Sequence, residues 1–578
     1  MASQVTLQAF TGNTFDTSAS FILNINNDLY IFNIPETTQK MILSKNVKYE
    51  SLKAAFITSL YPESVGGLSM FVIQGYHMIE SLFSIVGPSQ IPDVILYDPD
   101  YVKEETTQKH PINVLDTFSN EDLEVKQIKL QKSIFYDVNL KILNQRMLVV
   151  DCRTIDDLRY LPDLSQYSVV THLTIPEIFV QNEYIEFFAS KSSVTNICFM
   201  PSGTISNSQS NEYYNIRRHK ALQVLCYGKT MKPPEGFIDF TSYGSTYNFV
   251  TRKADVNQSV KYVDLNYKKL KNLNKYEIYS KLISFNPKLP SFQNYTITFL
   301  GSSTKFVSPE RSNSGYLIHT KYGFIILDPS EGFLQQVVRK YGPKTTTYIL
   351  DNLVCVWLSH FHQDHCYGVP SLLHERSKVT NKPIHLCGPQ KFIDDIKKIS
   401  EIYGDFHLVC NNREVEGRVQ KSVDDMNDIP SELKINDHLS LFSIDVYHDI
   451  MFAKGCMIVI DGQTKIAFSG DRAFQKDHFA EVFQNCDLLI HEATFPDSKK
   501  KNAKVMTIKG HCFQHEAVET VKLMNPKYAV FTHLSLRYPD FLLKIKPGQN
   551  ILNAFDFLEF SDENIEFIFQ RCGIQKKK

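Results

Sequence analysis

The sequence predicts an α/β protein made of two copies of one sandwich domain, joined in tandem. Each half begins with three apolar segments in the same order: "VTLQAFTGN", "SFILNI" and "LYIFNIPET" in the first half, and "YTITFLGSS", "GYLIHT" and "GFIILDPSEG" in the second. A shared loop then follows, which reads "ITSLYPESVGGL" at residues 57–68 and "LSHFHQDHCYGV" at residues 358–369. The spacing of about 300 residues is far longer than a solenoid period and indicates duplication of a whole domain.

Strands and helices follow one another within each half. The apolar segments quoted above are predicted to be strands. Residues 391–403 ("KFIDDIKKISEIY") and 515–524 ("HEAVETVKLM") carry apolar residues at helical spacing, which predicts two helices. Strands followed by helices, twice over, predict an α/β sandwich in each half.

The joint between the halves is "SFNPKLPSFQNYT", which holds two prolines and several polar residues between periodic segments. We therefore predict a first domain at residues 1–284, a linker at 285–294 and a second domain at 295–578. Because a duplicated chain can mimic a dimer internally, we expect a monomer.

The composition is that of a soluble globular protein. Hydrophobic residues make up 43% and charged residues 22% of the 578 residues, and the net charge is −1. This charge excludes a strongly basic nucleic-acid binder but leaves room for a local basic patch. No apolar run reaches the roughly 18 residues that span a bilayer. The first residues have neither a secretory nor an Arg-rich mitochondrial pattern, and the eleven cysteines form no CxxC pair. We expect a protein of the nucleus, the cytoplasm or both, with reduced thiols and no membrane partner.

The second copy of the shared loop carries metal-ligand side chains. In "VCVWLSHFHQDHCYG" a buried strand leads into a loop with His360, His362, Asp364 and His365. Imidazole nitrogens and carboxylate oxygens are ligands that zinc accepts. Four such side chains in six residues cannot all serve one tetrahedral ion together with outside ligands, but two neighbouring ions can share them. The alternative without a function is a histidine-rich surface loop.

Further ligand types follow later apolar segments of the second half. His448 comes at the end of one predicted strand, Asp471 follows another in "TKIAFSGDRAF", and His533 directly follows "YAVF" and a threonine. Each alone is more often structural than functional. The succession of a histidine-rich loop, a histidine, an SGD element and a histidine is hard to obtain by chance, so we predict that all of them bind metal.

This succession resembles that of the metallo-β-lactamase superfamily, and within it the long form of tRNase Z. The segment "LLIHEATF" resembles the family's HEAT element, "KGHCFQHEAVET" its HST element and "FTHLSLRYPD" its last metal motif. The resemblance covers residues from about 295 to 540 and, more weakly, parts of the first half. It implies tandem αββα sandwiches of which the N-terminal copy has lost its ligands, with Ser59, Tyr61, Glu63 and Ser64 in their places.

The resemblance also implies the roles of the site residues. One zinc ion would be held by His360, His362 and His448, the other by Asp364, His365 and His533, with Asp471 bridging both; manganese suits such mixed ligands too. Two adjacent ions can activate a bridging water and hold phosphate oxygens. Asp364 would orient or deprotonate the water, and His511, oriented by Glu492, would protonate the leaving oxygen. The expected reaction removes the 3′ trailer of precursor tRNA and leaves a 3′-hydroxyl on the tRNA.

Basic side chains near these motifs are candidates for RNA contact, because phosphate neutralisation gives RNA affinity. Lys499, Lys500 and Lys501 precede His511, although such a charge run is more often a solvated loop. Arg311 stands in register with the arginine of the family's PxKxRN motif, and Arg537 follows the last ligand. The family's protruding tRNA-binding arm has almost no room between "KSIFYDVNL" and "QRMLVVD", so an arm there is absent or a stub.

Two other functions stay open on the sequence alone. The chain could be another hydrolase of this fold that acts on small esters or thioesters, or a non-catalytic RNA-binding scaffold. A hydrolase of small esters would need neither the HEAT element nor a degenerate half. The complete ligand set argues against a non-catalytic scaffold. A nuclease with a large inserted domain is disfavoured because His533 lies only 62 positions after Asp471.

Overall fold

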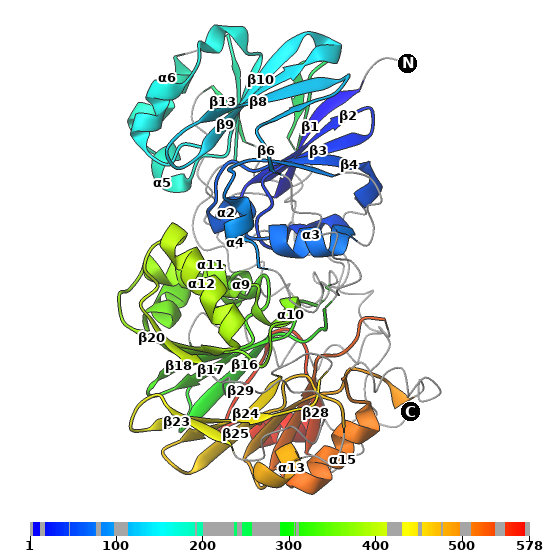
Figure 1. The fold of residues 1–578 in the computed structure, drawn as a ribbon, viewed down its shortest axis with the longest axis vertical. Coiled ribbons are helices and arrows are strands. Elements are labelled where there is room, and N and C mark those ends of the chain that lie inside the picture. Colours follow the sequence, from blue (N-terminus) through cyan, green and yellow to red (C-terminus); the bar gives the residue numbers. More distant parts are fainter. Residues whose placement is uncertain are drawn as a thin grey trace. The chain divides into compact units, whose positions relative to one another are not determined.

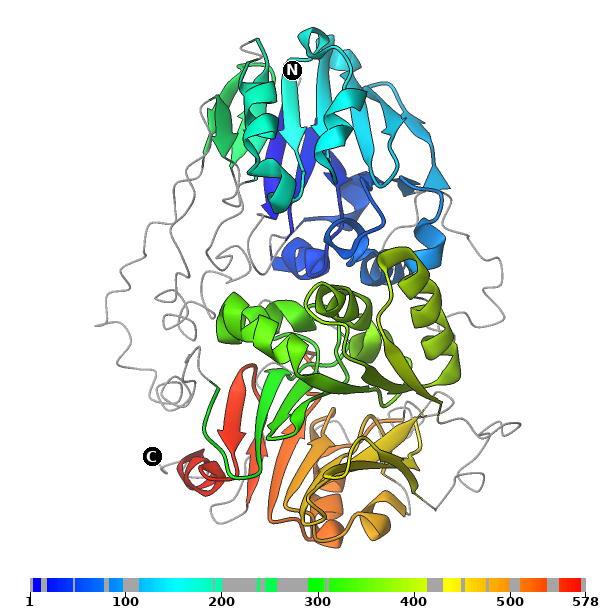
Figure 2. The ribbon, with the colours of Figure 1, turned by 90° about the vertical axis from the view of Figure 1, so that its left-hand side faces the viewer.

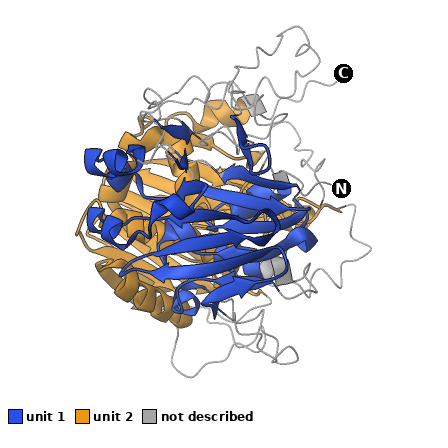
Figure 3. Ribbon diagram, turned by 90° about the horizontal axis from the view of Figure 1, so that it is seen from above, with its two compact units in different colours: residues 1–96, 103–268 blue, residues 97–102, 269–578 orange. Residues whose placement is uncertain are grey.

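The computed structural model divides the chain into two compact units (Figure 3), residues 1–96 with 103–268 and residues 97–102 with 269–578. The structure describes the residues drawn as coloured ribbon in Figures 1 and 2: 4–11, 18–44, 47–76, 83–96, 114–190, 193–199, 236–239, 245–256, 289–305, 307, 311–412, 430–448, 453–474, 478–497, 510–537 and 550–572. The predicted linker at 285–294 is described only from residue 289, so its boundaries stay a prediction. Within the described ranges, no helix combines the length and the hydropathy that crossing a membrane requires.

The C-terminal unit contains two seven-stranded mixed sheets. The first has the order β21-β20-β19-β18-β17-β16-β29 and the second the order β22-β23-β24-β25-β26-β27-β28. The strands of the first sheet are β16 (Tyr295–Gly301), β17 (Gly315–Thr320), β18 (Gly323–Leu327), β19 (Leu353–Trp357), β20 (Ile384–Gly388), β21 (Leu408–Asn412) and β29 (Leu558–Ser561). Those of the second are β22 (Ser431–Lys434), β23 (Leu439–Asp445), β24 (Lys454–Ile460), β25 (Thr464–Phe468), β26 (Leu488–Glu492), β27 (Tyr528–Thr532) and β28 (Ile551–Asn553).

Helices cover the outer faces of these two sheets, which gives four layers in the order αββα (Figures 1 and 2). The helices of this unit are α9 (Phe333–Asp351), α10 (Gln363–Cys366), α11 (Val369–Ser377), α12 (Gln390–Tyr403), α13 (His478–Val482), α15 (Gln514–Met524) and α16 (Ile565–Cys572). Helices α9, α11 and α12 lie on the first sheet, and α13 and α15 on the second. The predicted α/β sandwich is therefore confirmed in this unit.

An apolar core joins the inner faces of the two sheets. The ring of Phe468 on β25 lies with its centroid 5.1 Å from that of Tyr316 and 5.9 Å from that of Trp357. The indole nitrogen of Trp357 donates to the Ser443 hydroxyl of β23 at 3.1 Å, so this buried polar atom is satisfied. The strand ends that carry the candidate ligands are fixed by this packing.

The N-terminal unit repeats the arrangement with an eight-stranded and a seven-stranded sheet, in the orders β15-β14-β1-β2-β3-β4-β5-β6 and β13-β12-β11-β10-β9-β8-β7. The first sheet consists of β1 (Val5–Thr11), β2 (Ser20–Ile25), β3 (Asp28–Phe32), β4 (Leu52–Phe56), β5 (Ser84–Val86), β6 (Val114–Leu115), β14 (Thr246–Asn248) and β15 (Lys253–Asp255). The second consists of β7 (Thr117–Ser119), β8 (Leu123–Lys129), β9 (Ile134–Leu140), β10 (Gln145–Val150), β11 (Val169–His172), β12 (Thr195–Cys198) and β13 (Phe237–Asp239). The helices are α1 (Thr38–Ser44), α2 (Pro62–Val65), α3 (Leu68–Tyr76), α4 (Ile91–Val94), α5 (Pro176–Phe179) and α6 (Asn182–Ala189).

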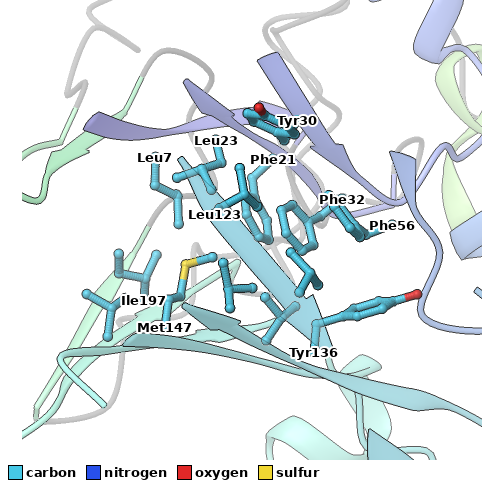
Figure 4. Packing of buried hydrophobic residues seen from close by; sticks show 14 of the residues in the cluster. Leu7, Phe21, Leu23, Tyr30, Phe32, Phe56, Leu123, Tyr136, Met147 and Ile197 are labelled. Atoms are coloured by element: carbon cyan, nitrogen blue, oxygen red, sulfur yellow. The ribbon is translucent and has the colours of Figure 1, made fainter. Parts of the chain in front are cut away.

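The core of the N-terminal unit lies between its two sheets and is rich in aromatic rings (Figure 4). Phe32 stacks on Phe21 and Phe56 with ring centroids 4.4 Å and 4.7 Å away, and Tyr136 of the other sheet lies 5.6 Å from Phe56. Strands β9 and β10 are joined by residues 141–144 alone, which leaves no space for a protruding arm at this position.

The strand registers show that the two units share their details. The antiparallel pairs β1–β2 and β16–β17 each have one register shift, at the C-terminal end of the first strand. The parallel pairs β3–β4 and β18–β19 each have one register shift, directly after the first paired residues. Phe56 pairs with Phe32 as Trp357 pairs with Leu327. The shared loop that follows is thus offset by the same 301 positions throughout (357 − 56).

The same backbone device holds both copies of the shared loop. Asn33 and Asp328, directly after β3 and β18, both have positive φ angles, 63° and 49°. Their side-chain oxygens accept the backbone N–H of Thr58 at 2.9 Å and of Ser359 at 2.7 Å. The equivalent positions in the two loops are Ser59 and His360, Tyr61 and His362, Glu63 and Asp364, and Ser64 and His365.

Candidate metal centre

The side chains predicted as ligands come together in the C-terminal unit from the ends of four strands. The loop after β19 supplies four of them, and the segments after β23, β25 and β27 supply one each. Three groups, each with ligand atoms within 4.8 Å of one another, are His360–His362–His448, His360–His365–Asp471 and Asp364–His365–His533. His438, the other histidine near β23, instead lies exposed beside Asp461.

The first group presents three imidazole nitrogens to one point. Nε2 of His360 and Nε2 of His448 lie 2.8 Å and 3.1 Å from Nδ1 of His362. Nδ1 of His448 donates to the carbonyl oxygen of Gly510 at 2.7 Å, and Nδ1 of His360 contacts the Ser359 hydroxyl at 2.8 Å. Burial and the neighbouring imidazoles hold the pKa of His360 and of His362 well below the usual value. Neutral rings whose lone pairs converge fit a shared divalent cation.

The second group adds two carboxylates. Nε2 of His533 lies 3.4 Å from Oδ2 of Asp364 and 3.3 Å from Oδ2 of Asp471, and Nε2 of His365 lies 3.1 Å from Oδ2 of Asp471. Burial lowers the pKa of His365, but the carboxylates of Asp471, Asp364 and Asp328 outweigh it and raise that pKa well above the usual value. Burial raises the pKa of Asp364, but His365 and His533 outweigh it and lower the value. This mixed nitrogen and oxygen set also fits zinc or manganese.

Asp471 lies between the two groups. Its Oδ2 is 3.1 Å from Nε2 of His365 and 3.9 Å from Nε2 of His360. The preceding Gly470 has a φ of 57°, and a Cβ there would lie 2.8 Å from Cβ of Ser359. The glycine of the SGD element thus allows its backbone to approach the histidine-rich loop closely. A carboxylate in this place can contact both groups at once.

Two residues that orient the histidines were not among the predicted site residues. Asp328 accepts the backbone N–H and the hydroxyl of Ser359 at 2.7 Å and 2.6 Å, and Nδ1 of His365 at 2.8 Å. Because that hydroxyl donates to Asp328, it accepts the Nδ1 proton of His360. Both rings therefore turn Nε2 towards the centre, as metal-binding histidines do. The sequence signal was a polar residue directly after the strand that became β18, in "LDPSEG".

The predicted pair of His511 and Glu492 also meets beside this centre. Nδ1 of His511 lies 3.1 Å from Oε1 of Glu492 and 3.8 Å from Oδ2 of Asp471. Glu492 is buried at the end of β26, where it also accepts the backbone N–H groups of Arg472 at 2.6 Å and Cys512 at 3.2 Å. Burial raises the pKa of Glu492, but His511 outweighs it and lowers the value. Glu492 is thus an acceptor-only group held from several sides.

The predicted RNA-contact residues are placed only in part. Ser303 forms bridges with Asn313, two residues after Arg311, and with Leu534, the residue after the predicted ligand His533. Arg537 is exposed four residues beyond that ligand. Lys499, Lys500 and Lys501 lie outside the described residues.

The equivalent place in the N-terminal unit holds a guanidinium group. Arg153, which follows β10, donates to Glu63 at 2.6 Å, Asp151 at 2.8 Å, Ser59 at 2.8 Å and Ser64 at 3.1 Å. The candidate metal groups found in the described part of the chain all lie in the C-terminal unit.

Comparisons with known proteins match parts of both units. Residues 324–534 match the family model described as "Beta-lactamase superfamily domain", and residues 8–67 match the one described as "tRNase Z endonuclease". The "Zinc phosphodiesterase ELAC protein 2 homolog" of Caenorhabditis elegans is 26% identical over 308 residues, which is 47% of this chain and 36% of the worm protein. "Ribonuclease Z 2, mitochondrial" of Schizosaccharomyces pombe is 28% identical over 263 residues, or 45% of this chain and 37% of that protein. The matched region thus spans little more than a third of these relatives.

A solved structure matches the whole architecture. The crystal structure of a long form RNase Z from yeast superposes with a TM-score of 0.74, at 16% identity, over 99% of this chain and 100% of the yeast chain. The metallo-β-lactamase fold is thus present twice, and the candidate metal site of the described residues lies in its second copy. The chain is similar to the long-form RNase Z of yeast in fold, and its residues 8–67 match the tRNase Z family model.

Proposed function

We propose that the chain is a zinc-dependent endoribonuclease that cleaves the 3′ trailer from precursor tRNA and leaves a 3′-hydroxyl on the tRNA. The observation that carries this proposal is the convergence of the predicted ligand set beside the His511–Glu492 pair in one buried centre. Two of the similar proteins carry the name ribonuclease Z, one from Schizosaccharomyces pombe and one from yeast. Precursor tRNA is therefore the proposed partner of a monomeric chain, and the nuclear or cytoplasmic location stays a prediction.

Two zinc ions fit the donor sets described above, and manganese is the alternative. We assign His360, His362 and His448 to one ion, Asp364, His365 and His533 to the other, and Asp471 to both. When bound, such ions lower the pKa of a water molecule and neutralise phosphate oxygens.

Side chains of the protein are proposed to orient the attacking water and to protonate the leaving oxygen. Asp364 is ionised because its pKa is held low as described above, so its carboxylate can accept a hydrogen bond from the attacking water and orient it. Attack at phosphorus breaks the bond to the 3′-oxygen of the tRNA, and the phosphate remains on the trailer. Because Nδ1 of His511 faces Glu492, Nε2 is the atom that gives a proton to this leaving oxygen. Arg311, Arg537, Lys499, Lys500 and Lys501 are proposed to neutralise phosphates of the substrate.

The proposal is tested with the full chain and a 3′-extended precursor tRNA, with and without a chelator. We expect chelator-sensitive cleavage at the end of the tRNA body, with a 3′-hydroxyl end. His362→Ala removes a ligand and should abolish cleavage. His438→Ala is the matched control, because this exposed histidine of the same unit bonds Asp461 and not the centre.

Other results would favour the competing functions. Hydrolysis of small esters or thioesters without tRNA cleavage would identify a small-molecule hydrolase. Binding of tRNA with no cleavage under any metal would identify a non-catalytic scaffold.

A further inference from the structure

We propose that the hydroxyl group of Thr494 positions both the metal ligand His533 and the carboxylate of Glu492, so that one side chain aligns the metal centre with the proton donor. This inference rests on the proposed function for its catalytic part. Its part about metal binding stands on the geometry of His533 alone.

Thr494 follows β26 by two residues and is buried. Its Oγ1 lies 2.6 Å from Oε2 of Glu492 and 2.9 Å from Nδ1 of His533. The two partners come from neighbouring parallel strands, β26 and β27, whose ends are thereby connected through a side chain. No role was predicted for Thr494 beyond its place in the HEAT element.

Counting protons fixes the direction of both hydrogen bonds. A threonine hydroxyl has one proton to donate and can accept at its lone pairs. Glu492 already accepts the N–H of Arg472 and of Cys512, so the hydroxyl donates to its Oε2. The hydroxyl must then accept the Nδ1 proton of His533.

This direction decides which nitrogen of His533 can bind a cation. With the proton on Nδ1, the lone pair is on Nε2, which lies 3.3 Å from Oδ2 of Asp471 and 3.4 Å from Oδ2 of Asp364. The same hydroxyl holds Oε2 of Glu492, while Oε1 faces His511. Loss of the hydroxyl therefore loosens a ligand and the partner of the proton donor together.

The backbone at this position is held independently of the hydroxyl. The N–H of Ala493 donates to the carbonyl of Thr532 at 3.0 Å, and the N–H of Ser535 donates to the carbonyl of Thr494 at 3.3 Å. The isosteric change Thr494→Val should thus keep the fold, and Thr494→Ser should keep the hydroxyl. Thr298→Val is the matched control, because this buried threonine also contacts a buried glutamate, Glu559, but on β29.

The first measurement is metal content, which needs no tRNA. Each variant of the full chain is dialysed against graded chelator, and bound zinc is determined by mass spectrometry. We expect Thr494→Val to lose zinc at a free-metal concentration about 10-fold to 100-fold higher than the original chain does. Thr494→Ser and Thr298→Val should retain zinc as the original chain does. Unchanged zinc retention in Thr494→Val would overturn the metal part of the proposal.

The second measurement is single-turnover cleavage of precursor tRNA at saturating enzyme and full metal loading. We expect the rate to fall about 10-fold to 100-fold in Thr494→Val, with substrate affinity unchanged and with recovery in Thr494→Ser. A rate loss in Thr494→Ser as large as in Thr494→Val would show that the hydroxyl is not the acting group. If Thr494→Val fails to fold, Thr494→Ala, which also lacks the hydroxyl, replaces it under the same criteria. A chain that cleaves no tRNA refutes the proposed function and leaves the zinc measurement valid.

Discussion

The guanidinium of Arg153 donates to the carboxylate of Glu63 inside the N-terminal unit, with Nη1 and Oε1 2.6 Å apart. Glu63 stands at the position that Asp364 holds in the C-terminal unit. Nη2 of Arg153 contacts the hydroxyls of Ser59 and Ser64, which replace two histidines. A permanently charged side chain of the protein thus lies among the residues at the positions that the predicted metal ligands hold in the C-terminal unit, and it neutralises the carboxylate of Glu63.

Replacing Arg153 should destabilise the N-terminal unit. Its side chain is 5% exposed, and Asp151 beside it is fully buried, so Arg153→Ala leaves a buried carboxylate without its cation. Breaking a buried pair in this way costs about 3–5 kcal/mol. The loss in the free energy of unfolding is measured by urea unfolding, and hydrogen exchange of the β10 amides assigns it to the N-terminal unit. Arg159→Ala is the control, because that arginine is 78% exposed in its pair with Asp156 and should cost about 1 kcal/mol or less. Equal losses in the two variants would contradict the role of Arg153.

Metal removal should affect the two units differently. Ligand binding stabilises the folded state that binds it, by about 2.7 kcal/mol when free metal is 100 times its dissociation constant. The candidate metal groups of the described residues lie in the C-terminal unit alone. We expect a chelator to lower the unfolding temperature of the C-terminal unit in calorimetry and to leave the N-terminal transition in place. A shift of the N-terminal transition of the same size would contradict this expectation.

Much of the fold was predictable because its signals are local. The helices predicted at residues 391–403 and 515–524 are observed as α12 and α15, each beginning one residue earlier. The predicted ligands were recognisable because each follows an apolar strand directly or within a few residues, and the strand ends converge. The glycine that the two loops share was also visible in the sequence, but only the structure shows why a glycine is required there. A Cβ at Gly67 or Gly368 would lie 2.2 Å or 2.1 Å from a carbonyl oxygen.

The residues that orient the site were not predictable in the same way. Asp328 reaches His365 across 37 positions of sequence, and Arg153 reaches Ser59 across 94. Such contacts depend on rotamers and on special backbone angles such as the positive φ of Asp328. Apolar periodicity carries no information about either. The sequence therefore predicts which side chains gather, and the structure adds which atoms face the centre.

The stability of the N-terminal unit should fall with acid because of His172. This histidine is buried between aromatic rings and bonded to Tyr184 and Asn196, and burial lowers its pKa to about 3. Between pH 6.5 and 3 the unfolded chain binds a proton that the folded chain does not, so stability is lost as the pH falls. The loss from pH 6.5 to 5 is about 2 kcal/mol, at 1.36 kcal/mol per pH unit.

Urea unfolding at both pH values measures this loss. In His172→Gln the part due to His172 should disappear, so the difference between pH 6.5 and pH 5 shrinks by about 2 kcal/mol. His438→Gln changes an exposed histidine and should leave that difference as it is. An unchanged pH dependence in His172→Gln would exclude the buried histidine as its source.

Replacing Asp328 by asparagine should weaken metal binding although the residue touches no predicted ion. Its two oxygens accept from the backbone and the hydroxyl of Ser359 and from Nδ1 of His365. The amide group introduced by Asp328→Asn offers one oxygen and two N–H donors, so at least one donor of the loop would face another donor. The ring of His365 or the Ser359 hydroxyl must then turn, and Nε2 no longer faces the centre in one fixed tautomer. We expect zinc affinity to fall about 10-fold to 100-fold in competition with a chromogenic chelator. Asp461→Asn is the matched control, because this aspartate likewise accepts from a histidine, His438, but at the surface. Equal zinc affinity in the two variants would mean that the contacts of Asp328 hold the loop without orienting its ligands.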